Sequence, residues 1–216
     1  MNKLIESGLR EKATWIMCQL CGQWPTQEFE CYLAGGALAG PVNDVDLFPV
    51  TEIPEPLAYC LATTKNATTY DTKPHPLQIC AYKKASLTEL VESFDYAHIQ
   101  VGAKIEMHKS RVSVQEVYCS EAYLAAHALG TTWFTGSAYP LSSLIRAEKY
   151  KSRGLLTRGK YIRSLIDVVT GIIERGFKNY EDFKDQLDAV DLGLLPDELE
   201  EVTHARLMRL YELLKR

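Results

Sequence analysis

The sequence predicts an α+β protein, with a mixed sheet and flanking helices over residues 1–135 and a helical domain over residues 136–216. Short apolar runs separated by turn residues, which are typical of strands, recur between residues 29 and 117. After Pro140 only helical periodicity remains. Because strand signals come first and helix signals follow, two separately packed domains are expected, with a natural boundary at residues 131–136.

Composition favours an ordinary globular protein. With 216 residues, 46% of them hydrophobic, the chain can build one large or two modest cores. It has no apolar stretch long enough for a membrane span and its N-terminus is charged, so we expect a cytoplasmic protein without a membrane partner. The six cysteines suggest reduced thiols. Cys18 and Cys21 have metal or redox spacing, but without a second such pair two core thiols are the simpler interpretation.

The first elements follow from periodicity and chain breakers. Apolar residues three and four apart predict a helix with one apolar face at the N-terminus. Pro54 and Pro56 break the chain after the second strand, and a proline suits the first turn of a following helix. The elements expected here are a helix at 3–22, strands at 29–34 and 44–50, a short helix at 57–62 and a strand at 77–82.

The later elements begin at a capping signal. Ser86 and Glu89 form a capping box, which predicts a helix that ends near Glu92. Gly130 is a C-terminal cap for the helix before it. The remaining expected elements are strands at 96–105 and 111–117, which form a hairpin, and helices at 121–129, 141–147, 155–171, 180–190 and 196–214.

The stretch with the clearest chemistry is CYLAGGALAGPVNDVDLFPV, residues 31–50. Side chains alternate along a strand, so Asp44 and Asp46 point to the same face. Two adjacent carboxylates repel each other unless a cation lies between them, and a set of oxygen ligands suits Mg²⁺. Gly35 and Gly36 form a turn in which backbone N–H groups can approach phosphates. Together these residues predict a site for a nucleoside triphosphate and its metal.

The same residues have simpler interpretations. A Gly-Gly pair is a common turn, and an Asp-x-Asp is often the solvated edge of a strand or loop. Here the aspartate pair lies among apolar residues, where a charge without a partner is costly, and this favours a site. A dinucleotide-binding turn is disfavoured, because it requires a third glycine that opens a helix.

The runs Tyr32-Leu-Ala-Gly-Gly36 and Asp44-Val-Asp-Leu-Phe48 resemble the signature of the nucleotidyltransferase superfamily, which has the DNA polymerase beta-like fold. That superfamily includes poly(A) polymerases, tRNA CCA-adding enzymes and aminoglycoside nucleotidyltransferases. The resemblance implies a Mg²⁺- or Mn²⁺-dependent transfer of a nucleoside monophosphate from an NTP such as ATP, with release of pyrophosphate. The connection from Gly36 to Asp44 is short for the family, and Gly40-Pro41 is expected to end any helix in it early.

The resemblance also implies a third carboxylate on a later strand. Asp95 is the best-placed acid, although a helix cap or turn role for it is also open. Glu106 would lie at the far end of the same strand, too distant to take part. The segment YPLSSLIRAEKY, residues 139–150, loosely resembles small phage-type nucleotidyltransferase-like proteins.

A basic helical face is the third candidate region. Ser142, Arg146 and Lys149 lie on or near one face at helical spacing, and Tyr150 is adjacent. Such a face can bind a triphosphate while the tyrosine stacks on a base. The alternative is a solvated face that pairs with the acidic segment 181–201.

The resemblance, together with the carboxylate and glycine pattern, predicts a nucleotidyltransferase whose metal ligands are Asp44, Asp46 and Asp95. The acceptor is open: an RNA 3′ end, a protein or a small molecule would all fit. The alternative is a catalytically inactive nucleotide-binding or interaction module of the same fold.

Overall fold

The computed structural model describes residues 3–81, 83–183, 209 and 212–213. The chain divides into two compact units, Met1–Leu129 and Gly130–Arg216, which we call the sheet unit and the helical unit. The boundary predicted from the sequence, after residue 135, lies a few residues later. In the part of the chain that the structure describes, no helix is both long and apolar enough to cross a membrane.

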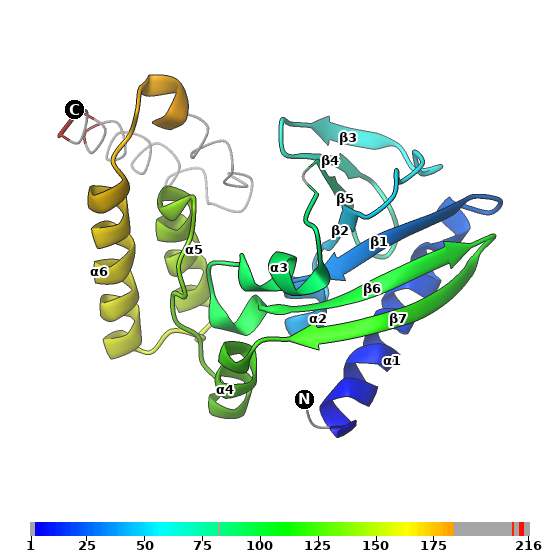
Figure 1. Cartoon of the computed structure of the whole chain (residues 1–216), viewed down its shortest axis with the longest axis horizontal. Coiled ribbons are helices and arrows are strands. Elements are labelled where there is room, and N and C mark those ends of the chain that lie inside the picture. The colour runs from blue at the N-terminus through cyan, green and yellow to red at the C-terminus, as the bar shows by residue number, and fades with distance from the viewer. Residues whose placement is uncertain (1–2, 82, 184–208, 210–211, 214–216) are drawn as a thin grey trace. The chain divides into compact units, whose positions relative to one another are not determined.

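Within its described residues, the sheet unit contains one mixed sheet in the order β3-β4-β5-β2-β1-β6-β7 (Figure 1). Only β2 and β5 pair in parallel among these strands, and the other neighbours are antiparallel. The predicted mixed sheet is confirmed. Its strands are β1 (Glu28–Ala34), β2 (Val45–Pro49), β3 (Cys60–Thr63), β4 (Ala67–Tyr70), β5 (Leu77–Cys80), β6 (Val101–His108) and β7 (Arg111–Cys119).

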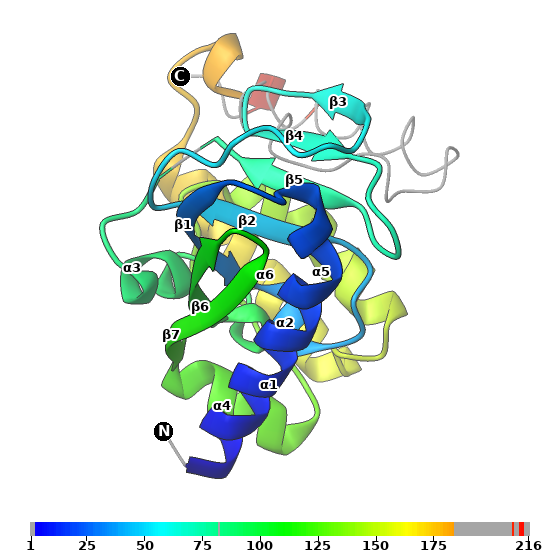
Figure 2. The same ribbon diagram turned by 90° about the vertical axis from the view of Figure 1, so that its right-hand side faces the viewer.

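Helices cover both faces of the sheet, and α1 and α3 lie on different sides of β6 and β7 (Figure 2). Alternation along β1 explains this, because Cys31 and Leu33 belong to the core under α1, whereas Tyr32 and Ala34 pack with α3. The helical elements of this unit are α1 (Lys3–Leu20), η1 (Cys21–Gln23), α2 (Gly36–Ala39), α3 (Leu87–Glu92), η2 (Ala97–Ile99) and α4 (Glu121–Leu129).

A glycine allows α3 to approach the sheet closely. A Cβ atom at Gly102 of β6 would lie 2.8 Å from Leu87 Cδ1 and 2.9 Å from Val91 Cγ2, distances that real Cβ atoms do not adopt. The predicted capping box starts this helix, since Ser86 Oγ accepts a hydrogen bond from the Glu89 N–H at 3.1 Å. Local capping and close packing therefore fix α3 over β6.

One predicted helix is wrong. Residues 57–62 were expected to be helical, but β3 occupies Cys60–Thr63 and pairs with β4, which the sequence analysis did not predict. Thr64 explains the hairpin, because its Oγ1 accepts hydrogen bonds from the N–H groups of Asn66 and Ala67 at 3.2 and 3.1 Å. The pairing of β4 with β5 then places both strands in the sheet.

The strand expected at 96–105 begins later, at Val101, and runs to His108. A 3₁₀ turn, η2, takes the preceding residues instead. The Gln100 side chain donates to the Phe94 carbonyl at 2.9 Å and accepts from Ser120 Oγ at 2.7 Å. These two hydrogen bonds, one buried and one partly buried, close the turn before Val101.

The helical unit contains α5 (Pro140–Ser152) and α6 (Arg158–Arg175), which pack against each other. Pro140 lies in the first turn of α5, where its missing N–H costs nothing. The core of this unit consists of Leu141, Ile145, Val168, Ile172, Phe177 and Phe183. Most of the helix predicted at 180–190 and most of the helix predicted at 196–214 lie outside the described residues.

Candidate functional site

One end of the sheet carries the Gly-Gly turn and the Asp-x-Asp motif. Leu33 of β1 pairs with Leu47 of β2 in an antiparallel register, so the end of β1 and the start of β2 lie together. The start of β6 lies at the same end, because the Gly35 N–H donates to the Val101 carbonyl at 2.9 Å. We call this region the sheet end. The sheet end contains Gly35 and Gly36 after β1, and both aspartates of the motif at or just before the start of the neighbouring strand β2.

The Asp46 carboxylate of the motif lies on the α3 face of the sheet. Val45 and Leu47 are buried in the core under α1, while Phe48 packs with α3. By alternation Asp46 shares the face of Phe48, and Asp44 directly precedes the strand; both aspartates are half-buried. The buried valine and leucine fix this register, since a shift by one residue would bury the carboxylates in the core.

The Asp46 carboxylate affects the pKa of a cysteine thiol on the neighbouring strand, β5. Asp46 lies opposite Gln78 of β5 in the parallel register. Burial, and to a lesser degree the nearby Asp46 carboxylate, raise the pKa of the Cys80 thiol well above its ordinary value. Cys80 therefore stays protonated beside the motif, and it adds no further negative charge to that of the two aspartates.

The two glycines have different roles in the turn. Gly35 has φ +85°, which L side chains rarely adopt, and its carbonyl accepts hydrogen bonds from the N–H groups of Leu38 and Ala39, each at 3.2 Å. Gly36 is exposed, and a Cβ atom there would meet nothing within 4 Å. Gly35 thus makes the turn possible, and Gly36 leaves its outer side open. The short helix α2 ends before Gly40, the early end that the sequence predicts.

Asp95 comes shortly before β6 in the chain, and it is buried. The Phe94 ring lies beside Gly35, 3.8 Å from the position of a Cβ atom there, and 5.9 Å from the Phe48 ring between centroids. Only 2% of Asp95 is exposed. The carboxylate sits between α3 and η2, in the turn that Gln100 closes.

Among the described residues, no group of three or more His, Cys, Asp and Glu side chains is placed to hold a metal ion. Glu106 lies towards the other end of β6, opposite Glu30 of β1. Two carboxylates still fit Mg²⁺, which commonly binds one or two carboxylates and completes its shell with waters and substrate phosphates.

The basic face predicted on α5 is uneven in its exposure. Ser142 and Tyr150 are buried, with 2% and 5% exposed, whereas Arg146 and Lys149 are half-buried. One described residue of the acidic segment, Asp182, pairs instead with Arg175 at 2.9 Å. Most of that segment lies outside the described residues.

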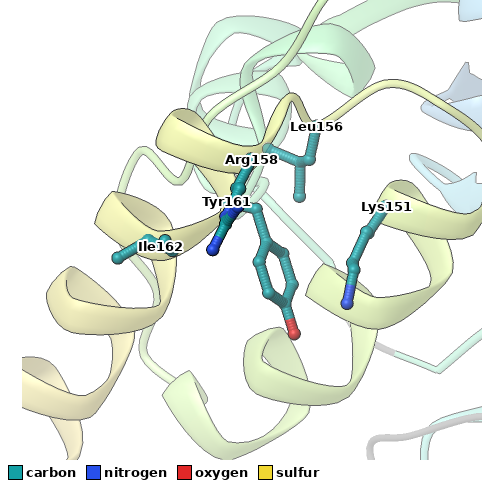
Figure 3. A pocket seen from close by; sticks show the side chains of 5 residues that line it. All are labelled: Lys151, Leu156, Arg158, Tyr161 and Ile162. Atoms are coloured by element: carbon teal, nitrogen blue, oxygen red, sulfur yellow. The ribbon is translucent and has the colours of Figure 1, made fainter.

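A second basic site, which the sequence analysis did not single out, lies where α5 ends and α6 begins. A hollow of about 410 Å³ is lined by Lys151, Leu156, Arg158, Tyr161 and Ile162 (Figure 3). Lys151 Nζ lies 4.3 Å from the centre of the Tyr161 ring. Glu148 accepts a hydrogen bond from the Tyr161 hydroxyl and lies 3.6 Å from Lys151. The cluster of Lys and Arg at 144–163 was the available signal, but only helix packing shows which of them meet.

Comparisons with known proteins give distant likenesses. No known family description matches the sequence, and no curated protein matches it. A CCA-adding enzyme solved with CTP aligns with a TM-score of 0.49 and 12% identity, over 84% of this chain and 49% of that one. A Thermotoga maritima CCA-adding enzyme complexed with tRNA aligns with a TM-score of 0.48 and 11% identity, over 94% of this chain and 53% of that one. The chain spans about half the length of these enzymes, and likeness at this level assigns it no activity.

Proposed function

We propose that this protein is a metal-dependent nucleotidyltransferase, which transfers a nucleoside monophosphate from an NTP to an acceptor hydroxyl or phosphate and releases pyrophosphate. One observation carries the proposal: the open Gly35–Gly36 turn and the half-buried Asp44 and Asp46 belong to neighbouring strand ends at the sheet end. A turn that admits phosphates beside two oxygen ligands is what a triphosphate with its metal requires. The nucleotidyltransferase signature in residues 31–50 supports the same reading.

Asp44 and Asp46 would hold Mg²⁺ or Mn²⁺. When bound, the metal supplies positive charge that stabilises the entering and leaving oxygens at the α-phosphorus. Gly36 leaves room for the β- and γ-phosphates to approach the backbone. Asp95 remains the proposed third carboxylate, with a role in orienting the acceptor.

On α5, the half-buried Arg146 and Lys149 are the proposed triphosphate contacts. Ser142 belongs to the same proposed triphosphate-binding face, and Tyr150 is the proposed stacking partner of the nucleotide base.

The side chains that line the hollow of the helical unit favour one class of acceptor over the others. Lys151 and Arg158 provide cations and Tyr161 provides an aromatic ring, while Glu148 pairs with Lys151 and accepts from the Tyr161 hydroxyl. Cations beside an aromatic ring suit a phosphate-bearing acceptor with a base, such as an RNA 3′ end, better than a neutral small molecule. We therefore rank a nucleic-acid acceptor above a protein or a small metabolite.

The direct test is transfer of label. The full chain is incubated with each α-³²P-labelled NTP, Mg²⁺ or Mn²⁺, and cell extract, and both the labelled product and the released pyrophosphate are measured. We expect a labelled macromolecule that ribonuclease destroys, and no label with the Asp46→Asn variant. If no NTP gives a product with either metal, the transferase function is wrong.

The alternative is an inactive nucleotide-binding module of the same fold, which the half-buried carboxylates also allow. A metal-dependent thermal shift with NTP fits both functions, so it cannot choose between them. NTP binding by calorimetry without pyrophosphate release, in the presence of the same extract, would establish the inactive module.

A further inference from the structure

We propose that Lys12 of α1 is a positioning residue for the Gly35–Gly36 turn. Its ammonium group holds the C-terminal end of α2, so that the turn at the other end of this helix is already in shape when a phosphate arrives. The inference rests on the proposed function, because the phosphate-binding role of the turn is part of that function.

The geometry is a bridge between distant parts of the chain. Lys12 Nζ donates to the carbonyl oxygen of Leu38 at 2.9 Å and to that of Gly40 at 2.6 Å. These residues are 26 and 28 positions away in the sequence. Lys12 itself is half-buried and precedes Ala13, which is fully buried in the core under α1. The packing of α1 therefore fixes the backbone from which the Lys12 side chain extends.

The helix that Lys12 holds is too short to be stable alone. Helix α2 has four residues, and isolated helices need roughly 12 or more to be even marginally stable in water. Its last carbonyl groups lack partners within the helix, and a cation at that end is favoured by the helix dipole. Lys12 meets both needs with one side chain.

Hydrogen bonds connect this end of α2 to the glycine turn. The Gly40 N–H donates to the Gly36 carbonyl at 3.1 Å, and the Gly40 carbonyl in turn accepts from Lys12. Leu38, whose carbonyl also accepts from Lys12, donates its N–H to Gly35. Both glycines are thus one hydrogen bond away from a residue that Lys12 holds. The same contact fixes Gly40, from which the chain runs on to Asp44.

The partial burial of Lys12 disfavours its charged form, which argues against an incidental surface contact. Partial burial lowers the pKa of Lys12, because it disfavours the charged form. The neighbouring cation on α1, Arg10, serves other partners, since it donates to the Val114 carbonyl of β7 and to Glu6. Only Lys12 of these two directs its charge to α2.

The test compares Lys12→Met, which keeps much of the length but removes the charge, with Lys12→Arg, which restores a cation. Lys3→Met, on the exposed start of α1, is the matched control. Hydrogen exchange of the amides of Leu38, Ala39 and Gly40 is measured without NTP. Lys12→Met should accelerate their exchange by about tenfold or more, Lys12→Arg should restore most of the protection, and Lys3→Met should change nothing.

Kinetics then separate positioning from a general structural role. Lys12→Met should raise the KM for NTP by about tenfold and change kcat by less than about twofold, because the turn contacts the phosphates and not the reacting oxygen. Unchanged amide exchange at residues 38–40 in Lys12→Met would overturn the positioning role, whatever the activity. A protein without transferase activity would remove the proposed function, and the exchange measurement would still decide the role of Lys12.

Discussion

Asp44 and Asp46 differ from Asp95 in what can reach them. Asp44 directly precedes β2 and Asp46 lies in it, and both are half-buried, beside a turn whose outer side is open. Asp95 lies in the turn between α3 and η2, with 2% of its surface exposed. Identical side chains in the same unit thus meet very different surroundings.

The difference separates two uses of a carboxylate. A metal that keeps waters and binds substrate phosphates needs ligands with an open side, which Asp44 and Asp46 have. A buried carboxylate has to be satisfied by the protein around it, since burying a charge without partners costs several kcal/mol. Exposure therefore makes the pair the primary candidates, and it makes Asp95 the residue whose role most needs a measurement.

The largest effect is expected at the exposed pair. Asp46→Asn and Asp44→Asn should each lower the rate of pyrophosphate release by about a thousandfold, because each removes one charge from the metal site. Since both residues are half-buried, the free energy of unfolding should change by no more than about 0.5 kcal/mol. Asp71→Asn, at an exposed position on the same unit, is the control for the charge change. Full activity in a folded Asp46→Asn protein would refute the mechanism.

Asp95→Ala should lower both kcat and stability. If Asp95 orients the acceptor, kcat should fall much more than NTP binding weakens. Its burial adds a cost of about 1–3 kcal/mol in the free energy of unfolding, because the groups around the carboxylate lose a partner. Both constants and a urea titration are measured, with Glu106→Ala as the control from the other end of β6. A normal kcat would leave a site with two carboxylates and give Asp95 a purely structural role.

The two glycines should separate binding from folding. Gly36→Val should raise the KM for NTP by about tenfold with little loss of stability, since its side chain would enter open space where the phosphates approach. Gly35→Ala should instead cost about 1–2 kcal/mol of stability, because φ is +85° there. Calorimetry with NTP and urea titrations of both variants are the measurements. An unchanged NTP affinity in Gly36→Val would show that the glycines serve only the turn.

The smallest effect is expected on the melting temperature, from the hydrogen bond between β7 and α3. The Tyr118 hydroxyl of β7 donates to Glu92 of α3 at 2.6 Å, and this hydrogen bond raises the pKa of Tyr118 to about 12. A raised pKa stabilises the folded state fully below the unfolded value of about 10, and the contribution is lost as pH rises through the folded value. Tyr118→Phe should therefore melt below the wild type at pH 8, and the two melting temperatures should converge as pH approaches 12. A gap that is the same at both pH values would assign the effect to packing.

Local signals were sufficient for much of the sheet unit. The capping box at Ser86 and Glu89 started α3 as expected, since both partners lie within one turn. The helix expected at 57–62 failed because nothing local shows that residues 60–63 pair with 67–70. Propensity is a weak guide where pairing across the sheet decides the structure.

The sequence alone determined the ingredients of the candidate site. Alternation along one strand places Asp44 and Asp46 on one face, and the Gly-Gly pair marks the turn, because both patterns depend only on neighbours in the chain. The tertiary structure decided which side chains meet: Lys12 with Leu38 and Gly40, Phe94 with Gly35, and Lys151 with Tyr161. It also decided that Asp95 is buried while the other two aspartates are partly open. The physical reason is that contacts between elements and the exposure of a side chain are set by packing, and packing depends on every element at once.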